Sequence, residues 1–423
     1  MLLAYFSILI LYSPNLLTEI DFTKPVSKIL DETGFGGQRK SQRENILKST
    51  LNKDVAKTKP TRAGKVTIQD LSDYLKLSKG TVSRALNKYP DIAESTQLRV
   101  ANAAERLGYR PSSHAQAIRT GLVKSVGLVL NVAGENAHKP FLSDFLHGIS
   151  LRLGEDDWTL VVATAQSDEH SIEVHSRLVA EQKVDGFILP RTKIHDERVE
   201  LLKSKGVPFV LYGRISDNTD CAWFDIAGEN AMEKAVARLH GFGHQRIAYI
   251  GGHADNNFEV LRRDGYLAGL AEAGIEADTD LIVDGAMSIE QGFRAAHTLL
   301  SLPVPPTAIV CALDRAALGA CRAAASLGLY VGRDVSVIGY DGIPEGAHAT
   351  PPLTTFAVDS NEAGTRLADI ILQVVRGAAA DSFRELVDAR LIERQSDGPA
   401  TKSPKEISAI VAEALQPSHG RKE

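Results

Sequence analysis

From residue 124 onward, short apolar runs alternate with stretches of helical period, and this alternation restricts the fold more than any other feature of the 423-residue chain. Strands that are apolar on both faces are typical of parallel sheets covered by helices on both sides. We therefore expect an α/β body with two doubly wound parallel sheets. The expected strands are 126–130, 160–163, 186–189, 209–212, 247–250, 281–283, 308–312, 335–340 and 356–358, with a closing strand at 386–394, and the expected helices are 144–154, 170–182, 227–240, 258–273, 289–300 and 316–327.

A different pattern precedes the body, at residues 66–87. Thr67 and Asp70 form a capping-box-like pair that starts a first short helix, and apolar residues follow at helical spacing. After a sharp turn at 76–78, Ser78 is placed to cap a second helix over 79–87, with Val82 and Leu86 facing inward. This is the spacing of a helix-turn-helix, although any pair of short amphipathic helices can imitate it. The residues on the outer faces of the second helix suit the base edges and phosphates of a DNA major groove: Lys79, Gly80, Thr81, Ser83, Arg84 and Asn87.

Charge is distributed unevenly along the chain. A third helix is predicted from residue 94 to a C-cap at Gly108, with Leu98, Val100, Ala101, Ala104 and Leu107 at core spacing. Residues 65–121 carry nine Lys and Arg against five acids, whereas residues 122–423 carry 29 against 42. A basic N-terminal module on an acidic body fits contact with phosphates, because counterion release drives non-specific affinity for DNA. The alternative is an ordinary solvated basic face.

The spacing of the cysteines and histidines and the motifs of the chain favour neither a metal site nor an enzyme. The cysteines Cys221, Cys311 and Cys321 have no paired spacing, so we expect buried free thiols in a reducing cytoplasm. Gly241 and Gly243 lie between His240 and His244, which favours a helix C-terminus over a zinc ligand pair. No glycine-rich nucleotide motif follows an expected strand, and no nucleophile–base–acid set is apparent. We expect no cofactor, no metal and no enzymatic activity.

The first 64 residues form a separate segment. The apolar run at 1–12 is too short to span a bilayer and has no basic residues ahead of it, so a secretory signal is not expected. Residues 24–65 are rich in Lys, Arg, Ser and Thr, as disordered arms are. We interpret 1–64 as a disordered extension or an artefact of start-site assignment, and we expect a cytoplasmic protein without membrane contact.

Two segments of the N-terminal module carry a family resemblance. Residues 81–87 (TVSRALN) and 108–111 (GYRP) resemble the DNA-binding headpiece and hinge of the lactose-repressor (LacI/GalR) family of bacterial transcription regulators. The resemblance extends over about 66–396, through 243–248, 334–341 and 351–355. It implies a helix-turn-helix domain at 65–111, a hinge at 112–123, a two-lobed effector-binding and dimerisation core of the periplasmic-binding-protein type I class at 124–398, and a tail at 399–423. The chain should cross three times between the lobes.

The resemblance also implies how the N-terminal module would act. Lys79, Gly80, Thr81 and Arg84 would read or grip the major groove of operator DNA, with Ser83 and Asn87 holding phosphates. The predicted DNA-binding set further includes Thr67, Tyr109 and Ala115. Residues 112–119 would form a hinge helix when two protomers bind side by side, and Ile118 stands where the family inserts an apolar wedge into the minor groove. The alternative for Ile118 is ordinary headpiece packing.

Strand ends nominate the effector site, because ligands of open α/β sheets bind beyond the carboxyl ends of the strands. Asp341 follows such a strand, and its carboxylate can accept hydrogen bonds from two sugar hydroxyls. Arg191 ends another strand with Thr192, and the resemblance makes Arg262, three residues before a glycine, an effector contact. Trp223 and Asp225 lie at a further strand end, where Trp223 could stack on a sugar face or plug the lobe interface. For Arg263 and Asp264 a surface ion pair is expected.

One residue departs from the family pattern. Leu313 stands where the family usually has Asn or Ser as a ligand contact, so the ligand is less polar there or its specificity comes from other groups. Residues 191–192 and 222–225 are similar to those of regulators of α-glucoside uptake. In the tail, residues 407, 410, 411, 414 and 415 have helical spacing too short for a coiled coil, which favours a frayed or docked helix.

The sequence thus predicts a homodimeric, DNA-binding transcriptional regulator, with a repressor as the expected form. Its operator affinity would be controlled by a small effector, a sugar or sugar derivative, in the cleft between the lobes. The rival prediction is a sugar-binding transport-type protein without DNA function. That protein would have a signal peptide and no basic headpiece, and the sequence shows the reverse.

Overall fold

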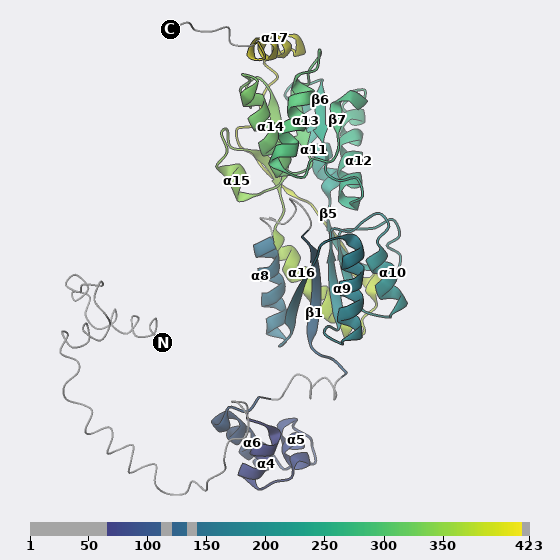
Figure 1. Ribbon diagram of the computed structural model, residues 1–423, viewed down its shortest axis with the longest axis vertical. Coiled ribbons are helices and arrows are strands. Elements are labelled where there is room, and N and C mark those ends of the chain that lie inside the picture. The colour runs from purple at the N-terminus through teal and green to yellow at the C-terminus, as the bar shows by residue number, and fades with distance from the viewer. Residues whose placement is uncertain (1–65, 111–120, 133–141, 417–423) are drawn as a thin grey trace, which may run out of the picture. The chain divides into compact units, whose positions relative to one another are not determined.

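The computed structural model describes residues 66–110, 121–132 and 142–416 (Figure 1). The chain divides into two compact units, Met1–Arg110 and Pro111–Glu423. The predicted extension 1–64, most of the predicted hinge, and the candidate residues Ala115 and Ile118 lie outside the described residues.

The first unit contains the three predicted helices, α4 (Ile68–Leu75), α5 (Lys79–Leu86) and α6 (Glu94–Leu107). The Thr67 and Asp70 side chains form the expected capping box, and the Ser78 hydroxyl accepts a hydrogen bond from the Thr81 amide at the start of α5. The helices pack around a small apolar core. Its buried members are Leu71, Leu75, Val82, Ala85, Val100, Ala103 and Ala104.

Two expected core positions of α6 were wrong. Leu98 is 58% exposed and Ala101 is also exposed, whereas Ala103 is buried. The buried face of α6 follows the stripe 100, 103, 104 and 107, which meets α4 and α5. Leu98 and Ala101 lie outside this stripe on a helix of 3.6 residues per turn.

The second unit contains two six-stranded sheets, each forming one lobe. In the first lobe all pairings are parallel, and in the second only the last strand is antiparallel. The predicted pair of doubly wound sheets is therefore confirmed. The first sheet has the order β11 (Arg384–Val387), β5 (Ala222–Ile226), β4 (Phe209–Tyr212), β3 (Gly186–Pro190), β1 (Ser125–Asn131) and β2 (Thr159–Ala165); the second has β12 (Arg390–Ile392), β10 (Thr354–Ala357), β9 (Ser336–Asp341), β8 (Ala308–Cys311), β6 (Ile247–Ile250) and β7 (Ile282–Val283).

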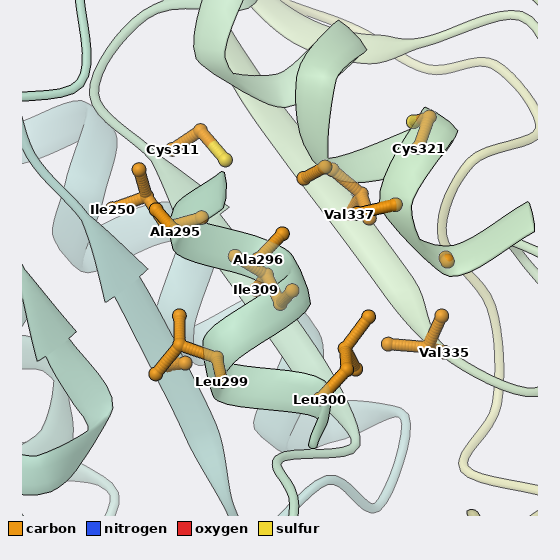
Figure 2. Packing of buried hydrophobic residues seen from close by; sticks show 14 of the residues in the cluster. Ile250, Ala295, Ala296, Leu299, Leu300, Ile309, Cys311, Cys321, Val335 and Val337 are labelled. Carbon is orange, nitrogen blue, oxygen red and sulfur yellow. The ribbon is translucent and has the colours of Figure 1, made fainter. Parts of the chain in front are cut away.

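Helices cover both faces of each sheet, which explains why the strands are apolar on both sides. In the first lobe, α8 (Leu142–Glu155) and α16 (Ser360–Val375) pack on one face, and α9 (Asp168–Ala180) and α10 (Glu197–Ser204) on the other (Figure 1). In the second lobe, α11 (Gly228–Gly241) and α12 (Asn257–Glu272) face α13 (Ile289–Leu300) and α14 (Asp314–Ser326) across the sheet. Figure 2 shows part of this core, with Ala296 and Leu299 of α13 on the same side of the sheet as Ile309 of β8 and Val337 of β9.

The chain crosses between the lobes three times, as predicted, but the closing strand was wrong. Instead of one strand at 386–394 there are two, because β11 pairs with β5 in the first lobe and β12 pairs with β10 in the second. The short link at Asp388 and Ala389 is the third crossing. After it, α17 (Pro404–Ala414) packs Ile407 and Val411 into the core of the second lobe, so the tail helix is docked.

The three cysteines and His244 lie in the packed interior of the second unit. All three cysteines are free and buried, and burial raises the pKa of the Cys321 thiol to about 12. The His244 ring is hydrogen-bonded to Thr307, Ser336 and the Gly398 carbonyl. Across 66–110, 121–132 and 142–416, no helix has the length and apolar character that a bilayer crossing requires.

Candidate functional site

The outer surface of α5 presents most of the predicted DNA-binding residues. Lys79, Gly80, Arg84 and Asn87 are exposed. Asn87 donates from its amide to the Ser83 carbonyl at 2.7 Å, which closes the last turn of the helix. A Cβ on Gly80 would meet only the Ser78 hydroxyl, at 3.7 Å, so the start of α5 is open to close approach by a ligand backbone.

Several headpiece candidates, including the exposed Arg84, already contact other residues of the first unit. The Thr81 hydroxyl lies 2.9 Å from that of Ser78, and Thr81 is half-buried, as is Ser83. Arg84 forms an ion pair with Asp91 and lies over the Tyr89 ring. In Thr67 the hydroxyl belongs to the capping box, and Tyr109 packs against the apolar core. Lys79 therefore has the most freely extending cationic side chain of the predicted α5 contacts, while Arg84 must exchange or share its acidic partner to bind a phosphate.

A cavity of about 130 Å³ opens in the second unit where the carboxyl ends of the two sheets face each other. The first lobe contributes the ends of β3, β4 and β5, and the second contributes α12, the segment after β8 and the end of β9. Four of the five predicted effector residues line it, namely Arg191, Asp225, Arg262 and Asp341. The other lining residues are Pro190, Thr192, Tyr212, Gly213, Ile226, Gly228, Phe258, Leu261, Leu313, Tyr340, Val358 and Ser360.

Trp223 is the predicted effector residue that does not line this cavity. Successive side chains of a strand point to opposite faces, and the neighbours Ala222 and Phe224 belong to the core on the α8–α16 face. Trp223 therefore packs on the α9–α10 face of the sheet, with the Arg214 guanidinium 6.0 Å from its ring centroid. Stacking on a ligand in the cavity is not available to it in this arrangement.

Asp341 is held at the cavity by strong local constraints. Its backbone has φ = +120°, and the following Gly342 has φ = +77°. The buried Asp314 carboxylate fixes this turn, because it accepts hydrogen bonds from the Gly342 and Ile343 amides at 2.8 and 2.9 Å and from the Thr355 hydroxyl at 2.6 Å. Asp314 had no predicted role, since its partners lie 28 to 41 residues away in the chain.

Burial dominates the electrostatics at Asp341. It raises the pKa of the Asp341 carboxyl from 3.8 to about 7, although the guanidinium of Arg262 lies 4.0 Å away and opposes the shift. Arg191, at φ = +52°, also favours the ionised carboxylate, and burial lowers its own pKa. The cavity thus places two guanidinium groups around one carboxyl that titrates near neutral pH.

The second cavity carboxylate, Asp225, is already paired. Arg214 donates from Nε to Asp225 at 2.7 Å and from a terminal nitrogen to Glu229 on α11, also at 2.7 Å. Burial raises the pKa of Asp225, with Arg214 opposing the shift. Arg214 was not predicted, although it stands two residues after β4 and the strand-end rule could have nominated it. Its ion pair with Asp225 lies within the first lobe, whereas its ion pair with Glu229 joins the first lobe to the second.

Further contacts join the lobes beside the cavity. The Asn257 amide donates to the Thr192 carbonyl at 3.0 Å, and the Asn257 side chain donates to the Arg214 carbonyl at 2.9 Å. Lys193 and Asn256 form an isolated antiparallel bridge across the same boundary. The loops after β3 and β6 therefore meet along one rim of the cavity.

Arg262 is placed by a set of contacts that the sequence did not indicate. It donates to the Ala312 carbonyl at 2.6 Å, and its guanidinium carbon lies 3.7 Å from the Tyr340 ring centroid and 4.8 Å from that of Phe258. A Cβ on Gly228 would lie 2.9 Å from Arg262 Cγ, so the glycine makes room for the side chain. The neighbouring Arg263 forms a surface ion pair with Asp284, at 2.9 Å, and not with Asp264 as expected, because consecutive residues of a helix do not face each other.

Comparison with known proteins places both units in one family. A profile described as "Bacterial regulatory proteins, lacI family" matches residues 67–112, and a periplasmic binding protein-like domain matches 236–396. The HTH-type transcriptional regulator AglR of Rhizobium meliloti (strain 1021) is 36% identical over 79% of this chain and 95% of its own. RafR of Escherichia coli, another HTH-type transcriptional regulator, is 31% identical over 75% and 95%.

Comparison with solved structures leads to the same family. The lac repressor dimer bound to operator and the anti-inducer ONPF is 27% identical over 79% of this chain and 100% of its own, with a TM-score of 0.69. A complex of the transcriptional regulator CelR with cellobiose is 28% identical over 78% and 100%, with a TM-score of 0.61. With a helix-turn-helix unit, a two-lobed body and relatives matched over nearly their whole length, the chain belongs to the lacI family of bacterial regulatory proteins and is a DNA-binding transcriptional regulator, not an enzyme.

Proposed function

We propose that α5 binds operator DNA and that a sugar in the cavity between the lobes controls the affinity of this binding. The observation that carries the proposal is the composition of the cavity wall. It combines carboxyl groups, guanidinium groups and tyrosines with apolar surfaces from Leu261, Leu313 and Val358. Carboxylates and guanidinium groups bind hydroxyls, and the apolar and aromatic surfaces suit the C–H faces of a sugar ring.

The size of the cavity indicates how the control would work. At about 130 Å³ it is smaller than the roughly 300 to 1,000 Å³ of most small-molecule sites, although it adjoins a second cavity of about 540 Å³ with which it shares Ile226, Asp341, Val358 and Ser360. A sugar held between Arg191 and Arg262 in the smaller cavity would have to separate the lobes. The Arg214–Glu229 ion pair and the Asn257 hydrogen bonds lie where that movement must occur. A ligand that binds one lobe arrangement better than another shifts the balance between them, which is how operator affinity would change.

At the DNA, Lys79, Gly80, Thr81 and Arg84 would contact the major groove, and Ser83 and Asn87 the phosphates. Thr67 and Tyr109 would act by supporting the helices. Ala115 and Ile118 keep their proposed hinge and wedge roles on the resemblance alone. Such a protein would work in the cytoplasm, next to the chromosome.

We propose that the protein binds its operator as a homodimer. Leu151 on α8 is 60% exposed and Val162 on the edge strand β2 is 45% exposed. The two elements are in contact. Exposed apolar residues on neighbouring elements favour an interaction surface, and an isologous dimer would also match a near-palindromic operator.

One sequence of measurements tests the proposal. A thermal-shift screen of sugars and sugar phosphates identifies ligands, and fluorescence anisotropy on DNA from the region upstream of the protein's own gene measures operator affinity with and without each hit. We expect at least one sugar to raise the Tm and to change operator affinity at least fivefold, with two chains bound per site. A protein that binds the DNA but responds to no sugar would contradict the effector, and one that binds sugar but no DNA would revive the transport alternative.

A further inference from the structure

Tyr340 lines the cavity and carries a buried hydroxyl whose hydrogen bonding is not satisfied by any residue that the structure describes. It lies on β9, directly before Asp341, and is fully buried among the apolar residues that α11 and α12 pack against. Its ring supports the Arg262 guanidinium, and the residue also lines the cavity. Burial raises the pKa of Tyr340 to about 12, so the hydroxyl keeps its proton and can donate it.

The Tyr340 hydroxyl has no hydrogen-bond partner among the described residues. The two other large buried tyrosines of this lobe do: Tyr249 donates to Glu259 at 2.7 Å, and Tyr266 donates to the Ile247 carbonyl at 2.9 Å. A buried hydroxyl without a partner is costly, so such a group calls for an explanation. Arg262 lies over the face of the Tyr340 ring, and its positive charge opposes the rise that burial causes in the pKa of the hydroxyl.

A second unpartnered group belongs to Arg262, another residue that lines the cavity. The Nε–H of Arg262 is buried and has no acceptor among the described residues, while another nitrogen of the guanidinium is occupied by the Ala312 carbonyl. The Tyr340 hydroxyl can donate or accept a hydrogen bond, whereas Arg262 Nε can only donate one. On the same cavity wall Leu313 can do neither. Neither atom is accessible in this arrangement, so a ligand hydroxyl would reach them only when the lobes move apart, and it would then supply the missing partner.

We propose that Tyr340 is a specificity-determining residue of the effector site, whose hydroxyl pairs with a hydroxyl group of the bound ligand. The ligand oxygen can accept from Tyr340 and from Arg262 Nε together. The site would then discriminate against ligands that carry hydrogen or an alkyl group at that position, because the buried hydroxyl would stay unpaired. This inference rests on the proposed function, since it assumes a hydroxyl-bearing ligand in the cavity.

The test compares Tyr340→Phe with Tyr266→Phe, which removes a hydroxyl that is already satisfied. In the ligand-free protein we expect Tyr340→Phe to leave the Tm unchanged or raise it. Tyr266→Phe should lower it by about 2 to 6 °C, because the Ile247 carbonyl loses its donor. Calorimetric titrations with sucrose, maltose, trehalose and cellobiose then measure binding. For each sugar that binds the wild type, Tyr340→Phe should raise the Kd about threefold to tenfold, and Tyr266→Phe should leave it unchanged.

The outcomes separate this inference from the proposed function. A Tm loss in Tyr340→Phe as large as that in Tyr266→Phe would show that the hydroxyl is paired within the protein, and would overturn the inference. So would an unchanged Kd for a sugar that the wild type binds. If the wild type binds none of the four sugars, the sugar effector loses its support, while the Tm comparison still decides whether the Tyr340 hydroxyl is unpaired.

Discussion

Replacing Asp341 by Asn should make the ligand-free protein more stable at alkaline pH. The pKa of Asp341 rises from 3.8 to about 7 on folding, because the carboxyl is buried at the cavity. Below pH 3.8 the group is protonated in both states. Between pH 3.8 and about 7 the folded state retains the proton and the unfolded state releases it, so stability falls as pH rises through this window. Above pH 7 the full cost is present.

The magnitude follows from the width of this window. Each pH unit costs about 1.4 kcal/mol, which gives about 4 kcal/mol for the whole window. Because 29% of the side chain is accessible from the cavity, water there reduces the cost, and we expect about 2 to 4 kcal/mol. Asn cannot ionise, so the free energy of unfolding of Asp341→Asn lacks this pH dependence.

Thermal unfolding of the full chain at pH 5.5 and 8.5 measures the effect. The difference between Asp341→Asn and the wild type should widen by about 1 to 2 kcal/mol, or roughly 2 to 6 °C in Tm, toward pH 8.5. Asp264→Asn, on the exposed side of α12, controls for the loss of one surface carboxylate. A difference between Asp341→Asn and wild type that stays constant over this pH range would refute the reasoning.

Two further predictions concern packing and capping. Gly292→Ala should destabilise the second lobe by about 1 to 3 kcal/mol, because its Cβ would lie 2.3 Å from the Ala316 carbonyl oxygen between α13 and α14. Gly154→Ala meets nothing within 4 Å and should be neutral or stabilising, so equal Tm values for the two variants would contradict the packing. Ser78→Ala should destabilise α5 by about 1 kcal/mol through loss of its N-cap, seen as faster hydrogen exchange in α5, with α6 amides as the internal control.

The headpiece and the sheets were predictable because their signals are local. Thr67 with Asp70 and Ser78 with Thr81 lie three residues apart, and both caps form as expected. The strand runs that formed β4 and β6 have the expected bounds, since a strand buried on both faces must be apolar throughout. The single closing strand failed because β11 and β12 pair with strands of different lobes, which a continuous run of residues does not reveal.

The candidate effector site was only partly predictable. The strand-end rule brought Arg191, Asp225 and Asp341 to the cavity, and the family resemblance added Arg262. The strand-end rule could not show that Trp223 faces the other side of the sheet. The rule locates a residue along the strand, whereas the pleat of the strand decides which face its side chain occupies. Nor did it show that Asp225 is occupied by Arg214.

The sequence by itself determined the helix-turn-helix, the two parallel sheets and the strand ends at which the cavity opens, because capping, periodicity and strand direction act over a few residues. Only the tertiary structure decided which polar groups are satisfied. Asp314 meets Thr355 across 41 residues, Arg262 meets Ala312 across 50, and the Tyr340 hydroxyl meets no partner among the described residues. Hydrogen bonding depends on positions in space, and these are set only when the helices and lobes pack together.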